Sequence, residues 1–176
     1  TAFEDIHHLV LFDFGIHWFD MAAQFMRGRQ PERVWATVAR TTFQKMKPPM
    51  IAQVAIEYPG AQVRLNFNGH VRHGQEDRTV VAGGRGTLRS FGPSLSEQTV
   101  VLHTVEGAAT PALEGTWFTS GFQGAMGELL CAIEEGREPG HGGRNNLESL
   151  ALCFAALASA DSGQPQKPGN VTALAK

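Results

Sequence analysis

The feature that most constrains this chain is a block of strand patterns between residues 34 and 105, with no helical pattern inside it. The clearest pattern lies at residues 62–68, where apolar and polar residues alternate as in a strand with one buried face. A Pro-Gly pair, typical of a tight turn, joins it to the strand pattern at residues 51–58. Strands joined by tight turns pair antiparallel, because a parallel pair needs a long crossover connection. Further strand patterns lie at residues 34–43, 79–82, 87–91 and 99–105.

Helical patterns flank this block on both sides. The first covers residues 9–28, and two more follow the strands at residues 122–133 and 147–158, with Gly136 and Gly163 placed as stops. Strands in one block with helices at its ends predict an α+β fold. We expect an open, mainly antiparallel β-sheet with helices packed on one face, and the other face available for oligomer contact.

Composition argues against several classes of partner. The 176 residues include 15 basic and 17 acidic side chains, so the chain lacks the basic surface that nucleic acid or an anionic membrane requires. No apolar run approaches the roughly 20 residues that span a bilayer. Cys131 and Cys153 each lie in an apolar helical pattern and are expected to be buried in a reducing compartment. We therefore expect a soluble, cytoplasmic domain that binds neither nucleic acid nor membrane.

A stripe of polar residues runs along the first helical pattern. Asp13, His17, Asp20 and Gln24 recur at steps of four, three and four, which places them in one narrow sector of a helix. Nearly all residues between them are apolar, so the remaining sides should be buried. The stripe must then face solvent, a hydrogen-bonding partner or a cleft, because an unpaired buried carboxylate is very costly.

The pair Asp13 and His17 has two interpretations. A carboxylate one turn before an imidazole can orient the ring and favour its protonated form, which suits proton transfer near neutral pH. Alternatively, Asp13 is the N-cap of a helix entered through Gly15, and His17 is satisfied in the core. The spacing leaves both open, since polar pairs four residues apart are common on helices.

Three other motifs carry weaker signals. The G-G-R-G cluster at residues 83–86 is followed by an extended segment, so we predict a hairpin turn and not a phosphate loop. His7 and His8 are adjacent, and neighbouring side chains on an extended segment point to opposite sides, so joint metal ligation is not expected. His70 and His73 lack an evident third ligand nearby. We therefore predict no metal site.

Five short motifs follow one another over almost the whole chain. They are D-F-G-I-H-W-F-D (13–20), E-Y-P-G-A (57–61), V-V-A-G-G-R-G-T-L (80–88), A-I-E-E-G-R-E-P (132–139) and N-N-L-E-S-L (145–150). In order and approximate spacing they resemble the C-terminal domain of the Gfo/Idh/MocA family (glucose–fructose oxidoreductase and inositol dehydrogenase) of NAD(P)-dependent oxidoreductases. Family members also carry an N-terminal Rossmann domain that binds NAD or NADP and holds the catalytic lysine in an E-K-P motif.

Nothing in this chain matches that N-terminal half. The resemblance implies that residues 1–176 are the substrate-binding and oligomerisation domain, without cofactor-binding residues of their own. The chain starts at Thr1 rather than at a methionine, and we expect it to be a fragment that is inactive by itself. Its expected partners are a sugar or polyol substrate, its own Rossmann domain, and further copies in a homodimer or homotetramer joined through the open sheet face.

The resemblance also assigns site residues. In relatives the D-x-G-x-H motif faces the nicotinamide, so His17 becomes the acid/base and Asp13 its orienting, substrate-contacting partner. That favours the catalytic interpretation of the pair over the N-cap. Residues 9–12 stand where relatives usually have a Gly-Gly pair, which makes the entry to the motif bulkier. His73 and Gln75 stand where several relatives have a substrate-contacting aromatic-Gly-Tyr stretch, and they become candidate substrate contacts; the alternative is that both are exposed loop residues.

The expected function is oxidation of a CH–OH group in a sugar, polyol or related hydroxy compound, with NAD or NADP accepting the hydride. A second hypothesis is a non-catalytic ligand-binding or assembly module with the same fold. A third is a relative that uses NAD for glycosidic cleavage or epimerisation. An assembly module does not need the pair Asp13 and His17, so the pair favours the enzymatic hypotheses.

Overall fold

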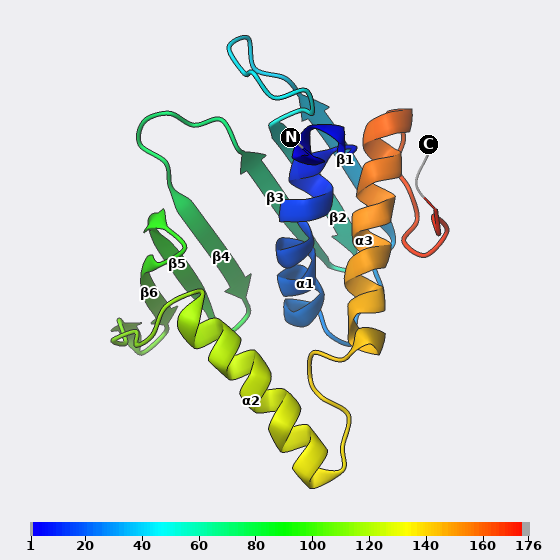
Figure 1. Cartoon of the computed structure of the whole chain (residues 1–176). Coiled ribbons are helices and arrows are strands. Elements are labelled where there is room, and N and C mark those ends of the chain that lie inside the picture. The colour runs from blue at the N-terminus through cyan, green and yellow to red at the C-terminus, as the bar shows by residue number, and fades with distance from the viewer. Residues whose placement is uncertain (1, 174–176) are drawn as a thin grey trace. The chain divides into compact units, whose positions relative to one another are not determined.

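The computed structural model describes residues 2–173, which form two compact units (Figure 1). The first unit comprises Thr1–His70 and His141–Lys176, and the second comprises Val71–Gly140.

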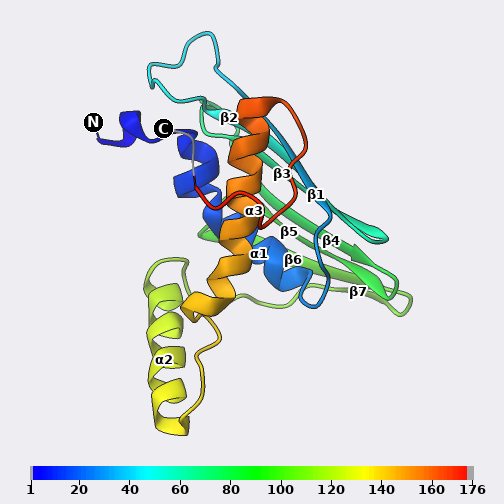
Figure 2. The same ribbon diagram turned by 90° about the vertical axis from the view of Figure 1, so that its right-hand side faces the viewer.

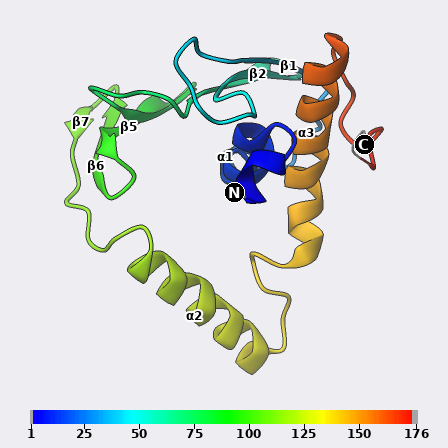
Figure 3. The same cartoon turned by 45° about the horizontal axis from the view of Figure 1, so that its top comes forward.

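The first unit is a three-stranded antiparallel sheet covered by helices. Its strands β1 (Arg33–Ala39), β2 (Ile51–Tyr58) and β3 (Ala61–Asn68) lie in the order β1-β2-β3. The pairing of β2 with β3 runs from Ile51↔Asn68 to Tyr58↔Ala61, which closes the predicted Pro-Gly turn. The helical elements are η1 (Ala2–Asp5), η2 (Val10–Phe14), α1 (Ile16–Phe25) and α3 (Gly143–Ser162), and α1 and α3 lie side by side on one face of this sheet (Figures 2 and 3).

The core of the first unit lies between that sheet face and the helices. Alternate residues of β2 are buried, as its apolar pattern predicts. The buried side of α3 includes the small residues Ala155, Ala156 and Ser159, which let the helix approach β1 closely. Ser159 of α3 is fully buried, and its hydroxyl accepts a hydrogen bond of 2.9 Å from the backbone N–H of Ala36. The largest fully buried side chains are Phe19, Leu11, Ile56, Leu152, Leu157 and Val34.

The second unit is a four-stranded antiparallel sheet followed by one helix. Its strands β4 (Asp77–Gly83), β5 (Gly86–Ser94), β6 (Glu97–Thr104) and β7 (Gly107–Ala109) pair in sequence order. The G-G-R-G cluster is the turn of the β4–β5 hairpin, which confirms the predicted hairpin turn. Helix α2 (Thr119–Glu135) ends at Gly136, whose φ of 64° is left-handed as the stop signal predicts.

The predicted α+β class is confirmed, with open antiparallel sheets and helices; the strands are divided between two sheets. The prediction that both cysteines are buried is wrong for Cys131, which is exposed because the apolar side of α2 is not covered. Cys153 is buried, and burial raises the pKa of its thiol to about 12. Among residues 2–173, no helix combines the length and apolar character needed to cross a bilayer.

Candidate functional site

The predicted site residues lie where the chain enters the first long helix. The segment Val10–Phe14 is a single turn of π-helix, closed by a 2.8 Å hydrogen bond from the Gly15 N–H to the Val10 carbonyl. The His8 carbonyl accepts from the N–H groups of Leu11 and Phe12 at 2.8 and 3.0 Å, which fixes the start of the turn. π-Helical turns are rare and occur frequently at functional sites.

Gly15 forms the junction between this π-turn and α1, and only a glycine fits there. A Cβ atom at this position would lie 2.6 Å from the Leu11 carbonyl oxygen and 2.9 Å from that of Val10. Both are backbone atoms, so the turn would have to open to make room. The glycine of the D-x-G-x-H motif is therefore required by the close approach of successive turns.

The π-turn and α1 present Asp13 and His17 at the surface. Asp13 lies within the π-turn, His17 lies in the first turn of α1, and both are exposed. The alternative interpretation is wrong, because the residue before α1 is Gly15, the helix start has no side-chain cap, and His17 is not in the core. In the described chain the two side chains do not form a hydrogen bond or ion pair with each other, so both are free to meet a ligand.

An aromatic cluster supports this surface. The Phe14 and Trp18 rings have centroids 4.4 Å apart, and the Trp18 ring lies edge-on to Phe67 of β3 at 5.9 Å. The His17 imidazole meets the edge of Trp18 at 6.2 Å. Phe14 is still 47% exposed, so apolar surface borders the two polar side chains.

The rest of the predicted stripe does not share this environment. The carboxylate of Asp20 accepts a 2.8 Å hydrogen bond from the hydroxyl of Ser149, which is fully buried on α3. Gln24 accepts from the Arg27 guanidinium at the exposed end of the helix. Asp20 thus ties α1 to α3, and only the first two members of the stripe remain open.

The other two predicted substrate contacts belong to the second unit. His73 and Gln75 are both exposed, in the segment that leads into β4. None of the four predicted site residues lines the cleft of about 890 Å³ beside the end of α1 and the start of α3. Tyr58 borders that cleft, where burial and the nearby Glu148 carboxylate raise the pKa of its hydroxyl.

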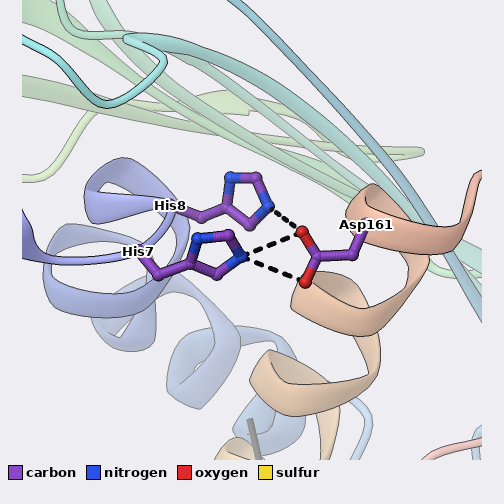
Figure 4. Close-up of side chains that lie close together, drawn as sticks. All are labelled: His7, His8 and Asp161. Carbon is purple, nitrogen blue, oxygen red and sulfur yellow. Dashed lines mark hydrogen bonds and ion pairs between the residues drawn. The ribbon is translucent and has the colours of Figure 1, made fainter. Parts of the chain in front are cut away.

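Sequence reasoning missed a second cluster, formed by His7, His8 and Asp161 (Figure 4). The Nε2 atom of His7 lies 2.9 and 3.0 Å from the two carboxylate oxygens of Asp161, and the Nε2 atom of His8 lies 2.7 Å from one of them. The expectation that the two histidines point to opposite sides is wrong, because the segment is not extended there. His8 has a left-handed φ of 48°, which turns both rings toward α3. In the sequence, the one indication of this cluster was that His7 and His8 come directly before the first helical pattern.

Comparison with known proteins gives a family and a relative. Residues 4–89 match the family model described as GFO/IDH/MocA C-terminal domain. Inositol 2-dehydrogenase from Rhizobium meliloti (strain 1021) is 27% identical over 157 residues, which is 84% of this chain and 46% of that protein.

Several solved structures share the fold of this chain. An oxidoreductase from Agrobacterium radiobacter, in complex with NAD+, L-tartaric acid and magnesium, matches 89% of this chain and 48% of its own with a TM-score of 0.76 and 20% identity. Aldose-aldose oxidoreductase from Caulobacter crescentus, complexed with glycerol, matches 87% of this chain and 45% of its own with a TM-score of 0.66 and 22% identity. At these identities the likeness establishes the fold. The chain spans about half the length of the relatives it matches.

Proposed function

We propose that this chain, whose residues 4–89 match the C-terminal domain of the Gfo/Idh/MocA oxidoreductases, belongs to that family and is the substrate-binding and proton-relay half of an NAD(P)-dependent dehydrogenase. The proposed substrate is a sugar, polyol or related hydroxy compound. The observation that carries the proposal is that the matched residues include the whole D-x-G-x-H segment, in which Asp13 and His17 are both exposed and the His17 ring contacts Trp18.

In the proposed reaction, one side chain of this chain accepts a proton and a second binds the substrate. Oxidation of a CH–OH group breaks an O–H and a C–H bond, and the nicotinamide of the cofactor accepts the hydride from carbon. We assign His17 as the base that accepts the hydroxyl proton, since histidine is the side chain most often used for proton transfer in catalysis. Asp13, one turn earlier, is assigned to bind a substrate hydroxyl and, once the substrate is bound, to orient the imidazole, with which it forms no hydrogen bond in the described structure. The partly exposed Phe14 ring offers the apolar contact that small-molecule sites combine with a few polar groups.

The cofactor is assigned to a separate domain. The glycine cluster of this chain is a β-hairpin turn, whereas a dinucleotide cradle needs glycines between a strand and a helix. NAD or NADP would therefore be bound by an N-terminal Rossmann domain outside this chain, and the chain alone would be inactive.

His73 and Gln75 are assigned as further substrate contacts on the strength of the motif alone. The free thiols are consistent with a cytoplasmic location. The proposed contact of a homodimer or homotetramer is the outer face of the β1–β3 sheet, where Trp35 is 42% exposed.

The test uses the full-length protein that contains this chain, with an inositol as the first substrate and NAD and NADP as cofactors. We expect His17→Ala to lower kcat by about 10²- to 10⁴-fold, the usual contribution of a general base, with a smaller change in KM. Asp13→Asn should raise KM as well as lower kcat. The matched control is His103→Ala, because His103 is an exposed histidine on β6 that is not part of the motif.

Two results would contradict the proposal. Full turnover by His17→Ala would remove the proton-relay role. Failure of the full-length protein to bind either nicotinamide cofactor would remove the enzymatic function and leave the assembly module. Cofactor binding without net oxidation of any polyol would instead favour the glycosidase or epimerase hypothesis.

A further inference from the structure

The cluster of His7, His8 and Asp161 has the composition of a metal site. We propose that these three residues bind a divalent transition-metal ion of the Zn²⁺ type, which fastens the start of the described chain to the last turn of α3. The proposal is independent of the catalytic role of Asp13 and His17. It rests on the donor set, on its spacing, and on the backbone conformation that creates it.

The donor set suits a borderline-soft dication. Two imidazole nitrogens and one carboxylate leave one or more positions open for water, an arrangement found in zinc and other transition-metal sites. In Figure 4 both imidazole rings, carried by the residues before η2, point their Nε2 atoms at the carboxylate on α3. Calcium and magnesium prefer all-oxygen sites, so the two nitrogens select against them.

The spacing of the donors is close to what such an ion requires. The three ligand atoms all lie within 4.8 Å of one another. Bonds of about 2.0–2.2 Å in a tetrahedral site place ligand atoms about 3.3–3.6 Å apart. The nitrogen–oxygen distances of 2.7 to 3.0 Å are shorter than this, so the side chains must move apart to admit an ion. Small side-chain rotations therefore open the hydrogen-bonded cluster into a coordination site.

Both imidazole rings can direct a lone pair at the same ion. They are tilted against each other with centroids 4.0 Å apart. A neutral imidazole binds a metal through an unprotonated ring nitrogen, so the ion would replace the contacts of the two Nε2 atoms with Asp161.

The backbone at His8 has an unfavourable conformation. Within residues 2–173, His8 is the one non-glycine residue with a positive φ, at 48°. Its side chain is 9% exposed, so the ring is held firmly, and its Nδ1 atom has no hydrogen-bond partner in the described structure. Such a conformation is costly and persists where the surroundings enforce it, which is often at a functional site.

The site is open to solvent on one side. The side chains of His7 and Asp161 are 49% and 33% exposed, so an ion and its water ligands can reach them. The carbonyl of His8 caps the π-turn that precedes α1. A metal ion at this site would hold the segment that carries Asp13 without touching Asp13 itself.

The primary experiment is calorimetric titration of the metal-free protein, produced without a polyhistidine tag, with Zn²⁺. We expect one ion per chain and a rise in Tm of about 5 °C or more at saturating Zn²⁺, because ligand binding to the native state alone stabilises it. Titration with Co²⁺ should give the visible absorption of a site with nitrogen and oxygen ligands. Imidazole ¹⁵N shifts should place the ion on the Nε2 atoms of His7 and His8, which needs no variant.

Matched variants complete the test. His7→Ala and Asp161→Asn should each weaken Zn²⁺ binding by about tenfold or more. The controls His103→Ala and Asp5→Asn, at an exposed histidine elsewhere and an exposed acid in the same segment, should bind as the parent does. The proposal is overturned if the parent protein shows no saturable Zn²⁺ binding, if His7→Ala and Asp161→Asn bind as tightly as the controls, or if the ¹⁵N shifts place the ion on other histidines.

Discussion

The two units of this chain follow the same sequence rules with different results. In the first unit the apolar faces of β1, β2, α1 and α3 meet one another and form a core of fully buried side chains. In the second unit Ala132 is the one buried residue among those described. The apolar residues of α2 are spaced as regularly as those of α1, yet Phe122, Leu130 and Ile133 are 66%, 58% and 67% exposed.

The comparison shows that an apolar pattern predicts the side of an element that can be buried, but not whether that side is buried. Periodicity determines which side of a helix or strand is apolar, whereas stability comes from what that side packs against. We infer that side-chain burial stabilises the first unit far more than the second. The predictions that follow test this difference, beginning with the largest effect.

Two phenylalanines on helices of the two units give the sharpest contrast. Phe19 on α1 is 0% exposed, and Phe122 on α2 is 66% exposed. We expect Phe19→Ala to lower the free energy of unfolding by about 3–5 kcal/mol, because it removes buried contacts and leaves a cavity. Phe122→Ala should change it by less than about 0.5 kcal/mol. Urea denaturation of both variants measures the difference, and equal losses would mean that α2 packs its apolar side as tightly as α1.

Two helix-associated glycines test backbone packing in the same way. Gly15→Ala places a Cβ 2.6 Å from a carbonyl oxygen, so the π-turn must shift. We expect a loss of about 1–3 kcal/mol in the free energy of unfolding, from strain or from a broken hydrogen bond. Gly124→Ala on α2 meets nothing within 4 Å. It should stabilise the helix by about 0.4–1 kcal/mol, through helix propensity and lower unfolded-chain entropy.

Circular dichroism during thermal unfolding gives both values. A Gly15→Ala protein as stable as its parent would show that the junction relaxes freely, and that the motif glycine is not needed for packing.

Much of the fold could be predicted because its signals are local. The residues of β2 were predicted with the observed bounds, and the left-handed stops at Gly136 and Gly163 were predicted from glycine alone. The division of the strands into two sheets could not be predicted, since turn and strand patterns do not say where pairing between neighbouring strands stops.

The predicted site residues are exposed, but the structure around Asp13 and His17 was not predictable. The π-turn depends on backbone hydrogen bonds such as that from Gly15 to Val10, which have no signature in the spacing of side chains. The cluster of His7, His8 and Asp161 depends on one backbone angle and on a contact between residues more than 150 positions apart. Local patterns carry no information on such contacts.

A smaller effect is expected at the tie between α1 and α3. Ser149→Ala removes the hydroxyl that donates to the Asp20 carboxylate and leaves that half-buried acid without this donor. We expect a loss of about 1–2 kcal/mol in the free energy of unfolding. Ser120→Ala, at an exposed serine of α2, should cost less than about 1 kcal/mol, since its hydroxyl accepts only from the exposed Thr116 N–H. Equal stability of the parent and Ser149→Ala would show that water replaces the hydroxyl at this helix contact.

The smallest expected effect is a pH dependence of opposite sign in the two units. Burial alone would raise the pKa of Asp161, but hydrogen bonds from His8 and His7 lower it below its usual value, whereas burial raises the pKa of Asp77 at the start of β4. The pairing of Asp161 therefore stabilises the fold above about pH 4 and is lost as the pH falls through its lowered native pKa. The contribution of Asp77 is complete below about pH 4 and is lost as the pH rises through its raised native pKa.

Metal-free Asp161→Asn and Asp77→Asn proteins separate these contributions. At about pH 6, Asp161→Asn should be less stable than its parent and Asp77→Asn slightly more stable, each by less than about 1 kcal/mol because both groups are partly exposed to solvent. Both differences should shrink toward about pH 3, when the parent carboxylates become protonated. Urea midpoints measured across this range provide the test. If both variants were more stable than the parent, or both less stable, the pKa values of Asp161 and Asp77 would not be shifted in opposite directions.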